Sequence, residues 1–342
     1  MKSNATHVHG EAASRRETVD ISLRDVVGTY TTVRGTVNAV DGVSLDIAGG
    51  GIIGVAGESG CGKTTLLKLL YGNVEYPLSL TRGSIRFNLD GMPITHETIR
   101  RYWFRRIAYI PQSSMSSLNP VIRIRKQFLD RAGYSQDNVF QGARGRRQQR
   151  ETLERVRQYL RELDLPVEVL DSFPHQLSGG MRQRVMVALA TFFHPDIILA
   201  DEPTTALDVV VQKGILLLLA EVQEALRNTI LIVTHDMGVH YQLTHRMVIM
   251  YAAKIVEYGP TEEVFSRPLH PYTKMLIESL PKVGDDRVRQ GAKGKPPSLY
   301  SELRGCRYAP RCPKAQAICR KQEPELAELS PGRRAACFFP EE

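Results

Sequence analysis

The stretch GESGCGKTT, residues 57–65, decides the fold expected of this chain. It follows the apolar run IIGVA and matches the phosphate-loop pattern G-x-x-x-x-G-K-[ST]. Glycines let the backbone wrap so that its N–H groups point at phosphate oxygens, and the N-terminus of the following helix adds partial positive charge. Lys63 is expected to bridge the β- and γ-phosphates, and the Thr64 hydroxyl to ligate Mg²⁺. The residues expected to contact a nucleotide here are Gly57, Ser59, Gly60, Cys61, Gly62, Lys63, Thr64 and Thr65.

The apolar runs around this loop predict an α/β fold. Short strand-like runs alternate with helical patterns. Two of the runs, at 197–200 and 229–233, are continuously apolar, as expected of strands buried on both faces of a parallel sheet. The other expected strands are residues 37–47, 52–56, 84–88 and 107–110, and the clearest helices are residues 63–71, 182–193 and 209–227.

Two further segments flank or interrupt this α/β domain, which we expect to span residues 20–259. Residues 113–195 are mostly helical in pattern, which predicts a helical subdomain inserted into the α/β core. Within it, the basic stretch GARGRRQQR (142–150) is expected to form a flexible exposed loop. Residues 1–19 are polar and are expected to form a disordered lead-in.

The sheet pattern ends after Gly259, and residues 260–342 are expected to form a C-terminal extension. A linker rich in Pro, Gly and Lys, residues 281–298, precedes a small tail that holds four of the five cysteines. With little apolar sequence of its own, such a tail needs a covalent or metal crosslink to fold.

Composition bounds the class of protein. The 342 residues carry a formal net charge of +8, which is compatible with a nucleic-acid partner, an anionic membrane surface or an ordinary solvated surface. The longest apolar runs are too short to span a bilayer, and the polar first residues lack the apolar core of a signal peptide. These features predict a cytoplasmic protein with reduced thiols.

Two carboxylates follow a buried strand in the stretch IILADE, residues 197–202. An acidic residue that emerges from such a strand beside a phosphate loop is the expected Mg²⁺ partner, here Asp201. Glu202 projects differently and is placed to polarise an attacking water. Alone, the pair would more simply be a helix cap or a surface pair; beside a phosphate loop, the catalytic interpretation is favoured.

The stretch LSGGMRQRV, residues 177–185, resembles the signature of the ATP-binding-cassette (ABC) family, with Met181 where the family usually has Gln. The resemblance covers roughly residues 20–340 and implies that ATP is hydrolysed in a head-to-tail dimer of two cassettes. It also implies that Ser178, Gly179 and Gly180 contact, in trans, the γ-phosphate bound by the other subunit.

The same resemblance assigns roles to residues in four other motifs. Gln112 in YIPQSS matches the glutamine that contacts Mg²⁺ and the attacking water. His235 in LIVTHD matches the histidine that holds the γ-phosphate, and Asp208 ends the loop TALD that crosses the dimer seam. Tyr30 matches an adenine-stacking aromatic, with a core or surface tyrosine as the alternative. The implied catalytic set is therefore Glu202, His235 and Gln112, and the implied Mg²⁺ ligands are Thr64, Gln112 and Asp201.

Two stretches look like the oligopeptide/dipeptide importer subfamily of ABC proteins: SSMSSLNPVIRI (113–124) and RPLHPYTKMLIESLP (267–281). The implied protein is a peripheral ATPase subunit on the cytoplasmic face of the membrane, most similar to the first of two paralogous ATPase subunits. Its implied partners are the second ATPase subunit, two transmembrane permease subunits and an extracytoplasmic binding protein, with no nucleic acid. Relatives that move oligosaccharides or nickel, a soluble ATPase acting on ribosomes or DNA, and a regulatory module with a silent ATPase site remain alternatives.

The tail cysteines, Cys306, Cys312, Cys319 and Cys337, are separated by five, six and seventeen residues. Structural zinc usually pairs ligands two to four residues apart, and the common ferredoxin spacings are also absent. Spacing alone therefore leaves the metal open. Resemblance to subfamily members with GCxxxPRCP tails implies a [4Fe–4S] cluster, with zinc, disulfides or free thiols as alternatives.

Overall fold

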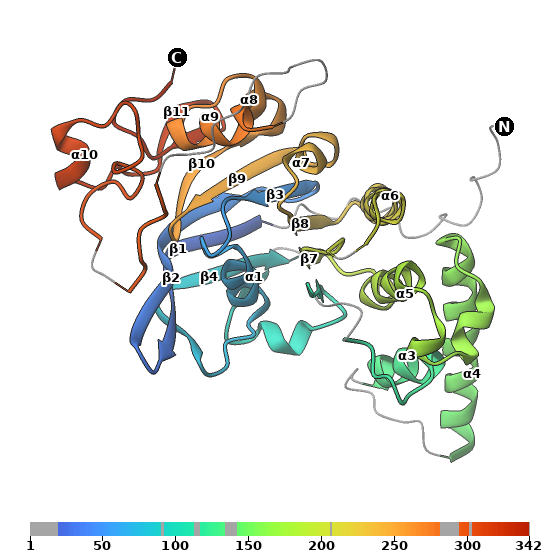
Figure 1. Ribbon diagram of the computed structural model, residues 1–342. Coiled ribbons are helices and arrows are strands. Elements are labelled where there is room, and N and C mark those ends of the chain that lie inside the picture. Colours follow the sequence, from blue (N-terminus) through green and yellow to red (C-terminus); the bar gives the residue numbers. More distant parts are fainter. Residues whose placement is uncertain are drawn as a thin grey trace.

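The computed structural model describes most of the chain. The described residues are 20–89, 92–112, 117–133, 142–205, 207–280, 294–300 and 303–341. Within them, two sheets stack around one helix, and further helices extend to one side (Figure 1).

The larger sheet carries the phosphate loop and has the strand order β11-β12-β10-β9-β3-β8-β7-β6. Its members β9, β3, β8, β7 and β6 run parallel, and the other three pair antiparallel. The strands are β3 Ile52–Ala56, β6 Ile107–Ile110, β7 Ile197–Asp201, β8 Thr229–Val233, β9 Arg246–Tyr251, β10 Lys254–Pro260, β11 Ala327–Ser330 and β12 Arg333–Ala335. The bounds of β3, β6 and β8 match the sequence prediction, and every residue of β7 and β8 is buried, as expected of a parallel core.

The smaller sheet is antiparallel, with the order β2-β1-β4-β5. Its strands are β1 Asp20–Thr32, β2 Gly35–Ile47, β4 Leu78–Leu89 and β5 Met92–Thr95. Here the sequence prediction was incomplete, because β1 was missed and β4 was expected to be much shorter. In the middle of β1, Asp25 adopts a φ of +48° where the register to both neighbours shifts, and this irregularity breaks the alternation of apolar and polar residues.

Nine α-helices lie in the described part of the chain, together with short 3₁₀ turns at Ile99–Tyr102, Val167–Asp171 and Pro174–Gln176. The helices are α1 Lys63–Tyr71, α3 Ile124–Gly133, α4 Gly142–Glu162, α5 Gly179–Thr191, α6 Val209–Leu226, α7 Met237–Leu243, α8 Thr261–Ser266, α9 Pro271–Glu278 and α10 Ala317–Lys321. Among the residues that are described, none of these helices has the length and apolar character needed to cross a bilayer.

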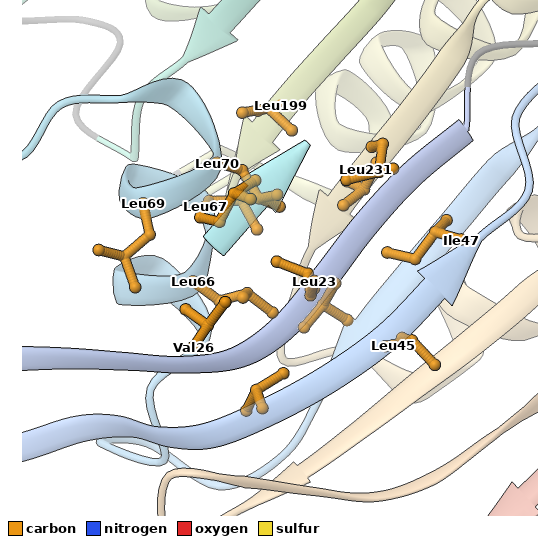
Figure 2. Close-up of a cluster of buried hydrophobic side chains, with 14 of the residues drawn as sticks. Leu23, Val26, Leu45, Ile47, Leu66, Leu67, Leu69, Leu70, Leu199 and Leu231 are labelled. Carbon is orange, nitrogen blue, oxygen red and sulfur yellow. The ribbon is translucent and has the colours of Figure 1, made fainter. Parts of the chain in front are cut away.

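Helix α1 lies between the two sheets and fixes the end of the phosphate loop. Its leucines share one buried cluster with Leu23 and Leu45 of the smaller sheet and with Leu199 and Leu231 of the larger one (Figure 2). Burying each such leucine stabilises the fold by roughly 2 kcal/mol. The loop before α1 is therefore held at the carboxyl edge of β3 by a helix that cannot shift without disturbing both sheets.

The chain between the neighbouring strands β6 and β7 forms α3, α4 and α5, which lie together away from the smaller sheet (Figure 1). A second buried cluster joins α5 to these helices and to the opposite face of the larger sheet. The stretch 142–150, expected to be a flexible loop, is instead the first half of α4, so that prediction was wrong. Arginine, glutamine and alanine are good helix formers, and Arg147 pairs with Glu151 one turn later at 2.8 Å.

The prediction that sheet structure ends after Gly259 was also wrong. Residues 303–341, here called the cysteine-rich segment, contribute β11 and β12, and β12 pairs with β10 through Glu257 and Tyr258. These strands are short, and their pairing partner lies about 75 positions earlier, so no local pattern announces them. A third buried cluster, which includes Tyr272 and Tyr308, joins this segment to α9 and β9.

Candidate functional site

The phosphate loop, residues 57–65, depends on close backbone approaches. Gly62 adopts a φ of +107°, and a Cβ at this position would lie 2.0 Å from the Ala39 carbonyl oxygen. A Cβ on Gly57 would lie 2.1 Å from the Met250 carbonyl oxygen. Only glycine fits at these two points, which explains the spacing of the motif.

Some of the other loop residues are exposed to solvent, and others are buried. Ser59 and Gly60 are exposed, whereas Cys61 and Thr65 are buried. Burial raises the pKa of the Cys61 thiol. Lys63 is 5% exposed, and its ammonium donates to the carbonyl oxygens of Gly57 at 2.7 Å and Glu58 at 3.0 Å.

Residues from three other strands meet the loop at one edge of the sheet. Asp201 ends β7, Gln112 lies two residues after β6, and His235 lies two residues after β8. Because β3, β6, β7 and β8 are parallel, their carboxyl ends lie at the same edge, where ligands of open α/β sheets bind.

Asp201 is the most buried carboxylate at this edge, with 1% of its surface exposed. It accepts hydrogen bonds from the Thr64 hydroxyl and the Tyr109 hydroxyl, both at 2.9 Å. Burial raises the pKa of Asp201, and these two hydrogen bonds partly oppose that rise. A buried carboxylate beside a hydroxyl forms an oxygen donor set of the kind that Mg²⁺ prefers.

The other two expected catalytic residues, Gln112 and His235, both contact the Glu202 carboxylate. The side-chain amide of Gln112 donates to it at 2.6 Å, and the hydroxyl of Thr205 donates at 3.0 Å. His235 Nε2 pairs with its other oxygen, while half of the His235 side chain remains exposed. Glu202 also adopts a left-handed φ of +47°, an uncommon conformation for this residue type that often marks functional sites.

The signature residues lie at a helix start of their own. Ser178 caps α5, accepting the Met181 N–H through its hydroxyl at 3.3 Å, and Gly179 and Gly180 begin the helix. Asp208 likewise caps α6, accepting the Val211 N–H at 2.9 Å. Both caps are exposed, as a surface that meets another molecule requires. Ala206 and residues 113–116, parts of two sequence motifs, lie outside the described residues.

Tyr30 lies on β1, where its ring is half-buried against the core cluster and its hydroxyl lies 3.5 Å from the Thr65 hydroxyl. This position is adjacent to the phosphate loop. Its role as an adenine-stacking residue stays a prediction.

The four tail cysteines converge. Cys306, Cys312, Cys319 and Cys337 line one small cavity, together with His270 and Phe338. The pKa of the Cys337 thiol is raised to about 11, first by burial and then by the neighbouring thiols. Over the described ranges, however, no three His, Cys, Asp or Glu side chains are grouped closely enough to hold a single metal ion.

Sequence reasoning missed several residues of this site. Tyr109, the one polar residue of the strand IAYI, was a detectable signal beside Gln112. Thr205 also lies within a motif that was recognised. Tyr272 and Arg311 bind Glu58 of the loop from more than 200 positions away, and no local pattern indicates them.

Two family models match the chain. The model described as ABC transporter matches residues 40–205, and the model described as oligopeptide/dipeptide transporter, C-terminal region, matches residues 256–319. The dimeric structure of a bacterial ABC transporter cassette matches with a TM-score of 0.59 and 26% identity, covering 70% of this chain and 98% of that one. A post-hydrolysis state of the same cassette bound to ADP and Pi matches with a TM-score of 0.57, 25% identity and the same coverage.

Curated relatives match over nearly the whole length. The dipeptide transport ATP-binding protein DppD of Caldanaerobacter subterraneus is 36% identical over 94% of this chain and 97% of the relative. The DppD proteins of Escherichia coli and Bacillus subtilis are 36% and 35% identical, covering 88% and 93% of this chain and 91% and 94% of their own lengths. The chain therefore belongs to the ABC transporter family, in the group of ATP-binding proteins that includes these dipeptide transport proteins.

Proposed function

We propose that this chain is the ATP-hydrolysing subunit that powers a binding-protein-dependent importer of dipeptides or oligopeptides. The observation that carries the proposal is the arrangement around Glu202, whose carboxylate is bound by Gln112 and His235 beside the phosphate loop. The cassette fold and the importer-type C-terminal region support it. The names of the relatives support peptides as the cargo, in preference to oligosaccharides or nickel.

In the proposed reaction, Glu202 orients a water molecule toward the γ-phosphorus. The water oxygen forms a bond to phosphorus as the bond to the bridging oxygen breaks, and ADP leaves. The Glu202 carboxylate would accept a hydrogen bond from this water and take up the proton that the water loses, so that phosphate and ADP are the products. Gln112 and His235 hold the carboxylate in place. The Lys63 ammonium has three N–H donors, so it would bind the phosphates while the loop carbonyl oxygens still hold it.

The residues at this edge fit a magnesium ion. Asp201 and Thr64 would hold it directly, with the side-chain oxygen of Gln112 as a third ligand. Bound there, Mg²⁺ would neutralise charge on the phosphate oxygens. The hydrogen bond from Tyr109 would keep the Asp201 carboxylate oriented.

The proposed site is shared between two cassettes. Ser178, Gly179 and Gly180 would approach the γ-phosphate held by a partner cassette, and Asp208 would lie at the seam. The exposed caps of α5 and α6 suit such a contact, and the matching cassette structures are dimeric. Following the subfamily resemblance, the partner is a paralogue.

We place the subunit on the cytoplasmic face of the membrane, against two permease subunits that receive peptides from an extracytoplasmic binding protein. The relatives' role in dipeptide transport supports this assembly. Residues 20–259 would form the cassette, with a helical subdomain at about 113–195, and residues 260–342 the importer-type extension. ATP-driven closure of the two cassettes would pull the docked membrane helices inward.

Peptide uptake in cells tests the proposal. Deleting the gene for this chain should abolish growth on a dipeptide as sole source of a required amino acid, and the wild-type chain should restore it. The Glu202→Gln variant should accumulate normally without restoring growth. Normal dipeptide uptake in the deletion strain, with loss of nickel or oligosaccharide uptake instead, would contradict the peptide assignment.

For the tail we propose a [4Fe–4S] cluster held by Cys306, Cys312, Cys319 and Cys337. Four thiols line one cavity, and iron bound there would offset the burial that raises the pKa of the Cys306 and Cys337 thiols, and the weaker repulsion between neighbouring thiolates. Bound there, the cluster would crosslink a segment with little apolar core.

Anaerobic purification tests this assignment. The full chain should be brown and contain iron and sulfide, and Cys312→Ser with Cys319→Ser should lose both. Cys61→Ser is the matched control, because Cys61 lies in the phosphate loop rather than among the tail cysteines. Colourless protein that contains zinc, or no metal, would contradict the cluster.

A further inference from the structure

The cysteine-rich segment reaches the phosphate loop through a single arginine. Arg311, which immediately precedes Cys312, forms two parallel hydrogen bonds to the Glu58 carboxylate, each at 2.9 Å. Its side chain is only 5% exposed and that of Glu58 is 25% exposed, so solvent screens the pair weakly. Paired hydrogen bonds of this kind fix orientation as well as distance.

Arg311 is itself held rigidly. Its guanidinium donates to the Tyr251 hydroxyl at 3.1 Å and lies 5.7 and 6.0 Å from the ring centroids of Tyr251 and Tyr308. Tyr251, Tyr272 and Tyr308 pack against one another with centroids 4.6 to 5.4 Å apart. Tyr308 belongs to the turn between Cys306 and Cys312, and its carbonyl oxygen accepts the Arg311 N–H. The position of Arg311 therefore follows the fold of the cysteine-rich segment.

Every polar group of Glu58 is bound. Its N–H donates to the Tyr272 hydroxyl at 2.8 Å, its carbonyl oxygen accepts from Lys63, and its carboxylate is held by Arg311. A rotation of the Glu58 backbone would move the carbonyl oxygen that accepts the hydrogen bond from the Lys63 ammonium. Contacts thus run without a break from Arg311 through Glu58 to the lysine expected to bind phosphate.

We propose that Arg311 is a positioning residue for the nucleotide site, and that the cysteine-rich segment thereby sets the affinity of the phosphate loop for ATP. This inference rests on the proposed function, because it concerns the nucleotide that the loop would bind. On this proposal the cysteine-rich segment is part of the ATP site. A loss of order among its four cysteines would displace Arg311 and Glu58, and through them Lys63.

The test is the dissociation constant of MgATP for the full-length chain, measured by titration calorimetry. Arg311→Ala and Glu58→Ala should each weaken binding about tenfold, and the double variant should be no weaker than either single one. In steady-state hydrolysis, Arg311→Ala should raise the KM for ATP with little change in kcat. A purely structural role for Arg311 would leave its effect intact in the Glu58→Ala background.

Two variants separate positioning from misfolding. Arg311→Lys keeps the charge without the paired hydrogen bonds and should recover part of the affinity. Arg320→Ala removes an exposed arginine of the same segment and should bind like wild type. Unchanged affinity in Arg311→Ala, or additive effects in the double variant, would overturn the inference while leaving the proposed function intact. Wild-type chain that binds no MgATP, or that binds it equally well as Lys63→Ala, would overturn both.

Discussion

The phosphate loop and the cysteine-rich segment meet at Glu58, yet different forces hold each of them. The loop follows a fully buried strand and precedes a helix packed between two sheets, and its shape comes from backbone approaches that only glycine permits. The cysteine-rich segment has two short strands and one helix of five residues, and besides the pairing of β12 with β10 and the cluster around Tyr308, charged side chains attach it to the cassette.

Buried arginines, among them Arg307, Arg311 and Arg333, contribute to that attachment. Arg311 binds Glu58, and Arg307 binds both Asp41 and the Ala252 carbonyl oxygen. Packing alone thus shapes the site that performs chemistry, whereas ion pairs add to packing in holding the segment that we propose to carry a cluster. Such a connection is sensitive to single side chains, whereas packing distributes its energy over many.

The largest effect on ATP turnover is expected from Asp201→Asn, which tests the site at the phosphate loop. Removing the proposed Mg²⁺ ligand should lower ATP turnover on the order of 10³-fold. Burial raises the pKa of Asp201 in the folded state, so the wild-type chain bears the cost of a buried charge at neutral pH and recovers stability as pH falls through the raised pKa.

The stability of the Asn variant should therefore equal or exceed that of wild type at neutral pH, and the difference should shrink toward acid. Thermal unfolding across this pH range measures it. A variant that is less stable than wild type at every pH would show that the hydrogen bonds of Asp201 outweigh its desolvation.

A smaller effect is expected from Gly62→Ala, which tests the claim of close backbone approach. The new Cβ would meet the Ala39 carbonyl oxygen at 2.0 Å at a φ of +107°, so MgATP affinity should fall about 100-fold. Gly60→Ala is the matched control: its φ is +79°, but nothing lies within 4 Å of the new Cβ. Its loss should be about tenfold or less. Equal losses in a binding titration would assign the effect to strain rather than to contact.

The smallest effect is expected from Arg307→Ala, which tests how ion pairs hold the cysteine-rich segment. It removes the ion pair to Asp41, which is partly screened, and should lower the free energy of unfolding by about 2 kcal/mol. Arg34→Ala, an exposed arginine in the turn after β1, should change stability little. If calorimetric unfolding shows equal melting temperatures for the two variants, the tail is held by packing after all.

The two regions also differ in how far sequence predicted them. The bounds of β3, β6, β8 and α1 follow from local apolar runs and from glycines at both ends of the helix, so pattern alone was sufficient. Asp201 and Glu202 were predicted because they follow a buried strand beside a phosphate loop, whereas Gln112 and His235 were predicted from the resemblance to the ABC family. In the structure the four side chains lie at one edge of the sheet.

For the cysteine-rich segment, the sequence predicted a small tail with four cysteines but neither its strands nor its contacts with the cassette. The pairing of β12 with β10, and that of Arg311 with Glu58, join residues 75 or more positions apart. No local period encodes such contacts, since they depend on how finished elements pack. The prediction for residues 142–150 was wrong although local sequence carried the information. Its glycines suggested a loop, but its remaining residues favour a helix, and α3 packs against that helix.

The most direct test of the central claim is ATP turnover by the Glu202→Gln variant of the full chain, assembled with a partner cassette whose own ATP site has been inactivated, so that only the site under test can hydrolyse. We predict that MgATP binds with wild-type affinity, because Lys63 and Thr64 are untouched, while kcat falls about 10³-fold. Turnover at the wild-type rate would contradict the account, since the residue at the centre of the Gln112 and His235 contacts would then have no part in hydrolysis.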